Sequence, residues 1–293
     1  MKNAITGAGR RLAWAIGMTL PLFASAQAEP INTDKPTLRI AFVLLREAQL
    51  PKHGDVVRAF DRYATGKDQH LRKGAGDRAS VPGDATQLFD LSTGGGAFVG
   101  LIPKPVPNGE AEEAAPFSVG SLMSGWKVPA HNAHLIVMLQ SAAGTPALEA
   151  LTQFTSLLAA VTEASDAVGV YWGNAGATYE PKFFLSIAQD KSTSARMMVW
   201  TGVSRARDAD GRMSFLSLGM GQLGLPDLLL VASKQAAHDA LPFFFDLLAS
   251  VAKEGKPIPE GDTVGRTDDE RLPVHYEASP TDPERQVWRV ELK

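Results

Sequence analysis

The sequence contains no cysteine, and this absence removes several kinds of chemistry at once. A chain without thiols forms no disulfide, carries no lipid on a cysteine, and has neither a thiolate nucleophile nor a thiolate metal ligand. Its stability must therefore come from a hydrophobic core, and 293 residues are enough to build one.

Long hydrophobic runs are also missing after residue 28. A helix that crosses a bilayer core of about 30 Å needs roughly 20 mainly apolar residues, so we expect no membrane span in the mature chain. Removal of the three basic residues before position 29 changes the formal net charge from −3 to −6. A mildly acidic protein of this kind is not expected to bind nucleic acid.

The N-terminus has the three parts of a secretory signal. Residues 1–11 carry three basic side chains and no acid, and residues 12–23 form an apolar stretch that is too short to span a membrane. Small residues follow, with Ala26 and Ala28 in an A-x-A pattern. We therefore predict a signal peptide over residues 1–28, cleavage after Ala28, and a periplasmic or secreted protein.

Hydrophobic periodicity predicts alternating strands and helices in the mature chain. The region around residues 64–85 is predicted to be an exposed loop, and residues 103–113, rich in proline and glutamate, an irregular one. The predicted strands are 37–45, 97–102, 134–139, 167–172, 197–204, 213–218, 227–232, 274–278 and 286–292. The predicted helices are 52–63, 119–126, 146–161, 181–188 and 235–253, the last of them interrupted or delayed by Pro242.

This alternation favours an α+β fold. We expect two α/β sandwich-like halves with mixed or antiparallel sheets, for which a ferredoxin-like arrangement is one candidate. The halves are assigned to residues 29–170 and 171–293.

One glycine motif matches the dinucleotide-binding pattern G-x-G-x-x-G, at Gly219, Gly221 and Gly224. That chemistry needs a helix directly after the glycines, so that the helix N-terminus faces the pyrophosphate. Here Leu225-Pro226 and a predicted strand follow instead. We interpret the motif as a bulged connection and expect no cofactor.

His131 and His134 are the only closely spaced histidines. Two imidazoles on one turn could bind zinc, with a third ligand from Asp262 or from Glu110, Glu112 and Glu113. The alternative is that both histidines are structural, because no HExxH or similar pattern accompanies them. They are weak metal candidates, and no metal is expected.

The chain has no G-x-S-x-G or P-loop sequence, and Ser121-Leu-Met-Ser124 lacks the lysine of an S-x-x-K motif. Trp126 could line a ligand site or belong to the core. Asp262 lies in Gly261-Asp-Thr-Val-Gly265, where a tight turn is the default interpretation and a ligand-facing carboxylate the alternative.

Four stretches together resemble the bacterial family called domain of unknown function 4261: 41–45, 126–137, 169–172, and 219–227 with 261–265. The resemblance implies an α/β domain and no reaction. The family pattern places a glutamate near Asp227 and the segment after it, whereas Leu228 to Leu230 are apolar here. Many relatives are cytoplasmic, so the signal peptide is a second departure.

Three functions follow as hypotheses. The first is a non-catalytic periplasmic binding or protein-interaction module with a protein partner in the cell envelope, and its candidate site residues are Trp126, His131, His134, Asp227 and Asp262. The second is a metal-assisted hydrolase that uses His131 and His134. The third is a structural subunit of an envelope assembly.

Overall fold

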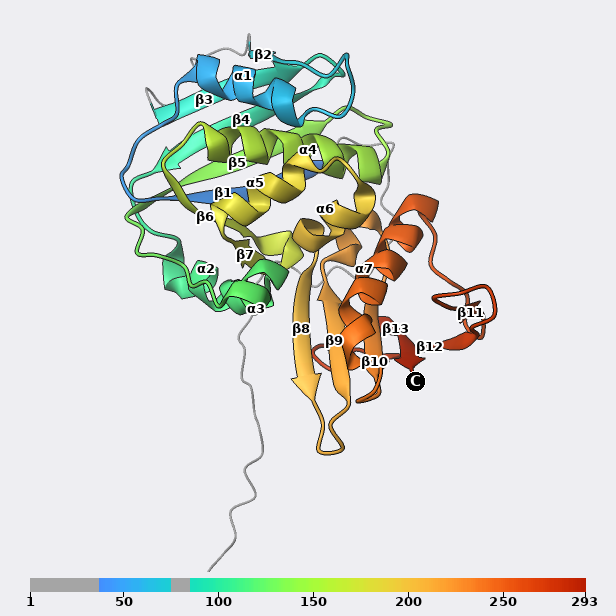
Figure 1. Cartoon of the computed structure of the whole chain (residues 1–293). Coiled ribbons are helices and arrows are strands. Elements are labelled where there is room, and N and C mark those ends of the chain that lie inside the picture. Colours follow the sequence, from blue (N-terminus) through green and yellow to red (C-terminus); the bar gives the residue numbers. More distant parts are fainter. Residues whose placement is uncertain (1–36, 75–84) are drawn as a thin grey trace, which may run out of the picture.

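The computed structural model describes residues 37–74 and 85–293. The predicted signal peptide, residues 1–28, lies outside the described residues. Within them, two sheets and the helices that cover them form the body shown in Figure 1. The α+β fold class with mixed and antiparallel sheets is confirmed.

The first sheet has seven strands in the order β2-β3-β4-β5-β1-β6-β7, and every neighbouring pair is antiparallel. The strands are β1 (Leu38–Leu45), β2 (Leu71–Lys73), β3 (Thr86–Leu91), β4 (Gly95–Ile102), β5 (Ala133–Ser141), β6 (Ala167–Trp172) and β7 (Ala177–Tyr179). The four strands β4-β5-β1-β6 have the order of two interleaved βαβ units, which is the pattern that a ferredoxin-like unit requires.

Three helices cover one face of this sheet: α1 (His53–Tyr63), α4 (Ala147–Glu163) and α5 (Pro181–Gln189). The strand side chains alternate, so that Ala41, Val43 and Leu45 of β1 face these helices and are buried. Leu151, Phe154 and Leu158 of α4 pack against them from the other side, as the helical spacing of apolar residues predicted.

The second sheet has six strands in the order β11-β12-β13-β10-β9-β8. Only β10 and β13 are parallel; the other neighbours are antiparallel. The strands are β8 (Gly202–Arg207), β9 (Met213–Leu218), β10 (Asp227–Ala232), β11 (Thr263–Val264), β12 (Leu272–Ala278) and β13 (Gln286–Leu292). The long helix α7 (Ala237–Glu254) follows β10 and packs on this sheet, and it continues through Pro242 rather than starting after it.

Three local predictions were wrong. Residues 197–200, predicted as the start of the strand 197–204, instead belong to helix α6 (Thr193–Trp200), which is capped because the Ser192 hydroxyl accepts a hydrogen bond from the Ala195 N–H. The segment from 64 to 85 contains strand β2, and β3 was not predicted, because Gln87 and Asp90 interrupt the apolar pattern of Thr-Gln-Leu-Phe-Asp-Leu.

The third error concerns the acidic segment, which was predicted to be irregular. It forms the short helix α2 (Glu110–Ala114) after a turn in which Asn108 and Gly109 have positive φ angles of 58° and 72°. Three glutamates in the first turn suit the positive end of the helix dipole, and alanines at 111 and 114 favour helix. A second short helix, α3 (Val119–Ser124), follows where one was predicted.

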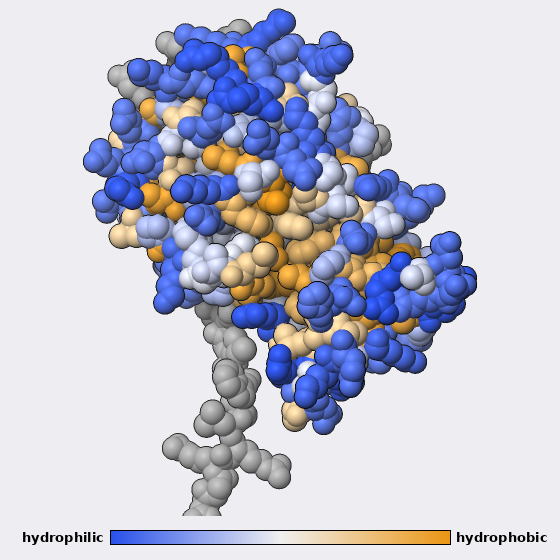
Figure 2. Space-filling model, viewed as in Figure 1, coloured by the Kyte–Doolittle hydropathy of each residue, from blue (hydrophilic) through white to orange (hydrophobic). Residues whose placement is uncertain are grey.

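The two sheets meet through the helices, since α5 contacts α6 and α6 contacts α7. Figure 2 shows hydrophobic residues gathered over these three helices. Their partly exposed apolar side chains, called here the helical patch, are Phe183, Leu185, Ile187, Met198 and Leu241. The first sheet extends to Tyr179 and the second begins at Gly202, while a division of the chain at residue 170 stays a prediction.

No helix in the described ranges is long and apolar enough to cross a membrane.

Candidate functional site

The two histidines lie close to one another at the start of β5, and the hydrogen bonds of His131 fix its tautomer. The backbone N–H of Val106 donates to Nε2 of His131 over 3.1 Å, so Nε2 must carry the lone pair and Nδ1 the proton. Nδ1 lies 3.5 Å from Oε1 of Glu112. Both ring nitrogens therefore face protein groups, and the ring itself is buried.

His134 is held in a similar way. Its Nδ1 donates to the carbonyl oxygen of Lys104 over 2.8 Å, and its ring meets the edge of Phe42 with the centroids 5.3 Å apart. Burial lowers the pKa of His134, with a further lowering from nearby His131, so the ring is neutral at pH 7.

Helix α2 covers these rings. Glu110 on this helix forms a side-chain hydrogen bond with Tyr171 of β6, whose ring lies 5.8 Å from that of Phe42. Burial, and then the negative charge of Glu110, raise the pKa of Tyr171 to about 12. We call His131, His134, Tyr171, Glu110 and Glu112 the histidine cluster.

The arrangement serves to attach α2 and the 103–109 turn to the sheet. A metal ion at His131 would have to displace the Val106 N–H or the proton on Nδ1. In the described part of the chain, no three histidine, aspartate or glutamate side chains are grouped so that they could hold a metal ion. Trp126 lies nearby in sequence, in the segment between α3 and β5, and its side chain is partly buried.

Asp262 is exposed and belongs to the other sheet. Its carbonyl oxygen accepts from Val274 N–H, and its own N–H donates to Pro259, which is the tight turn expected for this motif. The proposed grouping of Asp262 with the histidines is therefore not formed by the fold.

Asp227 holds the glycine motif in shape. Its Oδ1 accepts from the Ser217 hydroxyl over 2.7 Å and from the Met220 N–H over 3.1 Å, and the Ser217 oxygen accepts in turn from Leu228 N–H. Burial raises the pKa of Asp227 to about 6, against the opposing effect of these hydrogen bonds. The motif forms a single 3₁₀ turn (Met220–Leu223) between two strands, as the sequence indicated.

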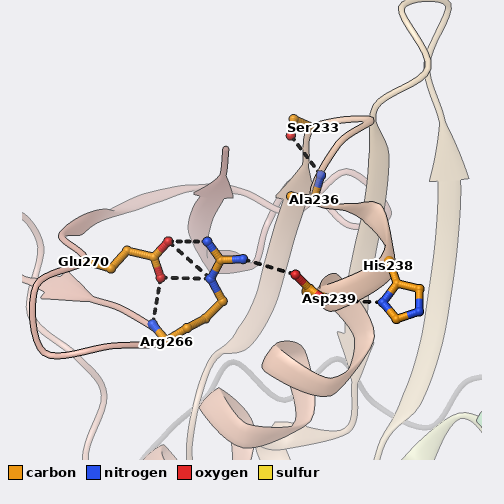
Figure 3. Close-up of polar contacts among 6 residues, drawn as sticks. All are labelled: Ser233, Ala236, His238, Asp239, Arg266 and Glu270. Atoms are coloured by element: carbon orange, nitrogen blue, oxygen red, sulfur yellow. Dashed lines mark hydrogen bonds and ion pairs between the residues drawn. The ribbon is translucent and has the colours of Figure 1, made fainter.

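A second polar cluster fastens the 261–271 segment to the first turn of α7 (Figure 3). Arg266 binds the carboxylate of Glu270 through its side chain and its backbone N–H, and it lies 3.5 Å from Asp239. Asp239 is in the first turn of α7, where a negative charge complements the helix dipole. The hydrogen bond with Glu270 raises the pKa of Arg266, and these contacts are structural.

The site residues predicted from the sequence include histidines and acids but not Arg39, which lies at the start of β1 and is 6% exposed. Its Nη2 donates to the carbonyl oxygen of Ala147, while Nε and Nη1 are buried without a hydrogen-bond partner among the described residues. An arginine inside an otherwise apolar strand was the available signal, because such a side chain is rarely buried without a counter-ion.

Comparison with known families gives one match. Residues 216–291 match the model of the family described as Domain of unknown function (DUF4261). This match supports assignment of the matched segment to that family. It covers the segment from β9 to β13, including Asp227 and the 261–265 turn, whereas the other stretches of the resemblance lie outside the matched residues. Neither a curated protein nor a solved structure matches the chain.

Proposed function

We propose that the protein is an exported, non-catalytic binding module whose partner is a protein of the cell envelope. The observation that carries this proposal is the face of the first sheet that the described residues leave largely uncovered. Helices α1, α4 and α5 pack on one face only, and α2 covers the end of the other face near His134 and Leu44.

Four apolar side chains cross the remaining part of that face in a continuous row. The register pairs Leu88 with Phe98, Phe98 with Met138, and Met138 with Ile40, on four adjacent strands. All four are partly exposed, and we call them the open row. No helix of the described residues is packed in a hydrophobic cluster with them.

A rigid row of this kind suits a protein partner with an apolar surface. The side chains are fixed by a sheet, and the Phe98 ring lies over Gly100, where a Cβ atom would come within 2.7 Å of Cε1. Contiguous exposed apolar surface is typical of interaction sites. The edge strands β2 and β7 have three residues each, so pairing at the outer edges of the sheet is disfavoured.

The export part of the proposal rests on residues 2–28 of the sequence. N-terminal sequencing of the protein recovered from periplasm or medium should give Glu29 as the first residue. Recovery of the chain in the cytoplasm with Met1 intact would contradict it.

The binding part is tested by affinity capture of the tagged mature protein from periplasm, with two matched variants. Met138→Glu places a charge in the open row, and Met198→Glu places the same charge in the helical patch. We expect a stoichiometric partner that is lost with the first variant and retained with the second. The proposal is contradicted by a partner that both variants retain, by loss through Met198→Glu alone, or by self-association of the purified chain through the row.

A further inference from the structure

Arg39 has hydrogen-bonding capacity that the described protein does not use. It makes one bond, from Nη2 to Ala147 O over 3.2 Å, and Nε and Nη1 have none. No carboxylate among the described residues forms an ion pair with it. A buried cation without a counter-ion is strongly disfavoured, and in agreement with this, burial lowers the pKa of Arg39 to about 10.

The strand that carries Arg39 has an open edge at the same place. Thr37 O accepts from Ser141 N–H, so the odd-numbered residues of this part of β1 direct their backbone groups toward β5. Leu38 and Ile40 direct theirs the other way, toward β6. However, β6 pairs with β1 only from Phe42 onward, and the chain leaves the sheet after Trp172.

A cavity of about 160 Å³ lies along this open edge. Thr37, Leu38, Arg39 and Ile40 form one wall, and Trp172, Asn174, Gly221 and Gln222 form the other. The Gln222 amide is already bonded, since it accepts from Trp172 Nε1 over 3.0 Å and donates to Trp200 O. The unused donors in this region therefore come from Arg39 and from the edge of β1.

We propose that this edge binds the C-terminal end of an extended peptide, with Arg39 as the partner of its terminal carboxylate. Unpaired N–H and C=O groups along a strand match the main chain of a peptide that adds as a further strand. An arginine whose donor nitrogens are not all used matches a carboxylate, which accepts charge-assisted hydrogen bonds. The two features together specify a peptide terminus rather than an isolated anion. The site shares Ile40 with the open row, but Arg39 belongs only to this site and Met138 only to the row, so variants at Arg39 and Met138 test the two proposals independently.

The test uses the purified mature protein and a random pool of N-acetylated tetrapeptides. One pool has a free C-terminal carboxylate, a second ends in an amide, and a third keeps the carboxylate but is N-methylated along its main chain. We expect only the first pool to raise the unfolding temperature and to show binding by calorimetry. Loss of a charge-assisted contact should weaken binding by about tenfold or more.

Two buried arginines supply matched variants. Arg196 of α6 is 1% exposed, also bonds one backbone carbonyl, that of Ala188, and also has an unpartnered Nε. Arg39→Met should abolish the response to the carboxylate pool, and Arg196→Met should leave it unchanged.

Three outcomes would overturn the proposal. They are no response to any pool, an equal response to the carboxylate and amide pools, and an undiminished response in Arg39→Met. Inorganic phosphate provides a further comparison, because stabilisation by phosphate that equals that of the carboxylate pool would show a general anion site in place of a peptide terminus.

Discussion

The histidine cluster and the β1 edge both place polar side chains within the first half of the molecule, yet they use them differently. His131 accepts a hydrogen bond from the Val106 N–H at Nε2, and its Nδ1 lies 3.5 Å from the Glu112 carboxylate without forming a hydrogen bond. Arg39 has two donors that nothing in the described chain accepts. The histidines, which most suggested a reactive site, thus stabilise the fold. The unused hydrogen-bonding capacity belongs to Arg39, which is part of no recognised motif.

The same contrast holds for the apolar surface. Leu44 and His134 are buried beneath α2, whereas the open row on the same face of the sheet is partly exposed. Binding is therefore expected where contacts are unused rather than where catalytic residue types gather. Substitutions at residues with used contacts and at residues with unused contacts test this difference.

The largest effect is expected from His131→Leu. The substitution leaves the buried Val106 N–H without an acceptor, which should lower the free energy of unfolding by about 2–3 kcal/mol. Denaturant unfolding measures this change, with His238→Leu as control, because the His238 side chain is 96% exposed. Unchanged stability of His131→Leu would show that the fold does not need this histidine.

The next effect concerns Asp227 and pH. Because its folded pKa is raised to about 6, the folded state holds the proton more tightly than the unfolded state does. Its contribution is fully present below the unfolded pKa, near 4, and is lost as the pH rises through about 6. The wild type should lose on the order of 2 kcal/mol relative to Asp227→Asn between pH 4 and pH 7. Parallel stability curves for the two proteins would contradict this.

A smaller effect is expected from Arg39→Met and Arg196→Met without ligand. Each removes a buried charge that lacks an ion-pair partner, together with one hydrogen bond, so stability should rise or stay within about 1 kcal/mol of the wild type. Thermal and urea unfolding measure the change. A loss of about 3 kcal/mol in Arg39→Met alone would mean that the fold depends on Arg39 as much as on His131.

The smallest effect is expected from Arg266→Ala. Its contacts with Glu270 and Asp239 are near the surface, and such pairs contribute about 0.5–1 kcal/mol. The difference in stability from the wild type should become smaller in about 1 M salt, because the screening length between exposed charges is then only about 3 Å. A loss that salt does not reduce would give this cluster a larger role.

The sequence predicted most of the elements because their apolar spacing is regular, as in α4 and β10. Prediction from apolar spacing failed where a helix cap or charged side chains decided the structure. The Ser192 cap makes 193–200 helical, and the glutamates of α2 form a helix that polarity alone would assign to a loop.

The candidate site was predicted less well, for a different reason. The pairing of His131 with Val106, 25 residues earlier, depends on how the 103–109 turn folds back over the sheet. The isolation of Arg39 from the acids of the described residues depends on the elements packed around it. Neither the contact of His131 with Val106 nor the surroundings of Arg39 can be predicted from composition and residue spacing.

The most direct test of the central claim is photo-crosslinking in living cells from a reactive residue placed at Met138 in the open row, compared with one placed at Trp126 in the segment between α3 and β5. We predict a discrete protein adduct from position 138 and none from position 126. An adduct from position 126 with none from position 138 would contradict this claim.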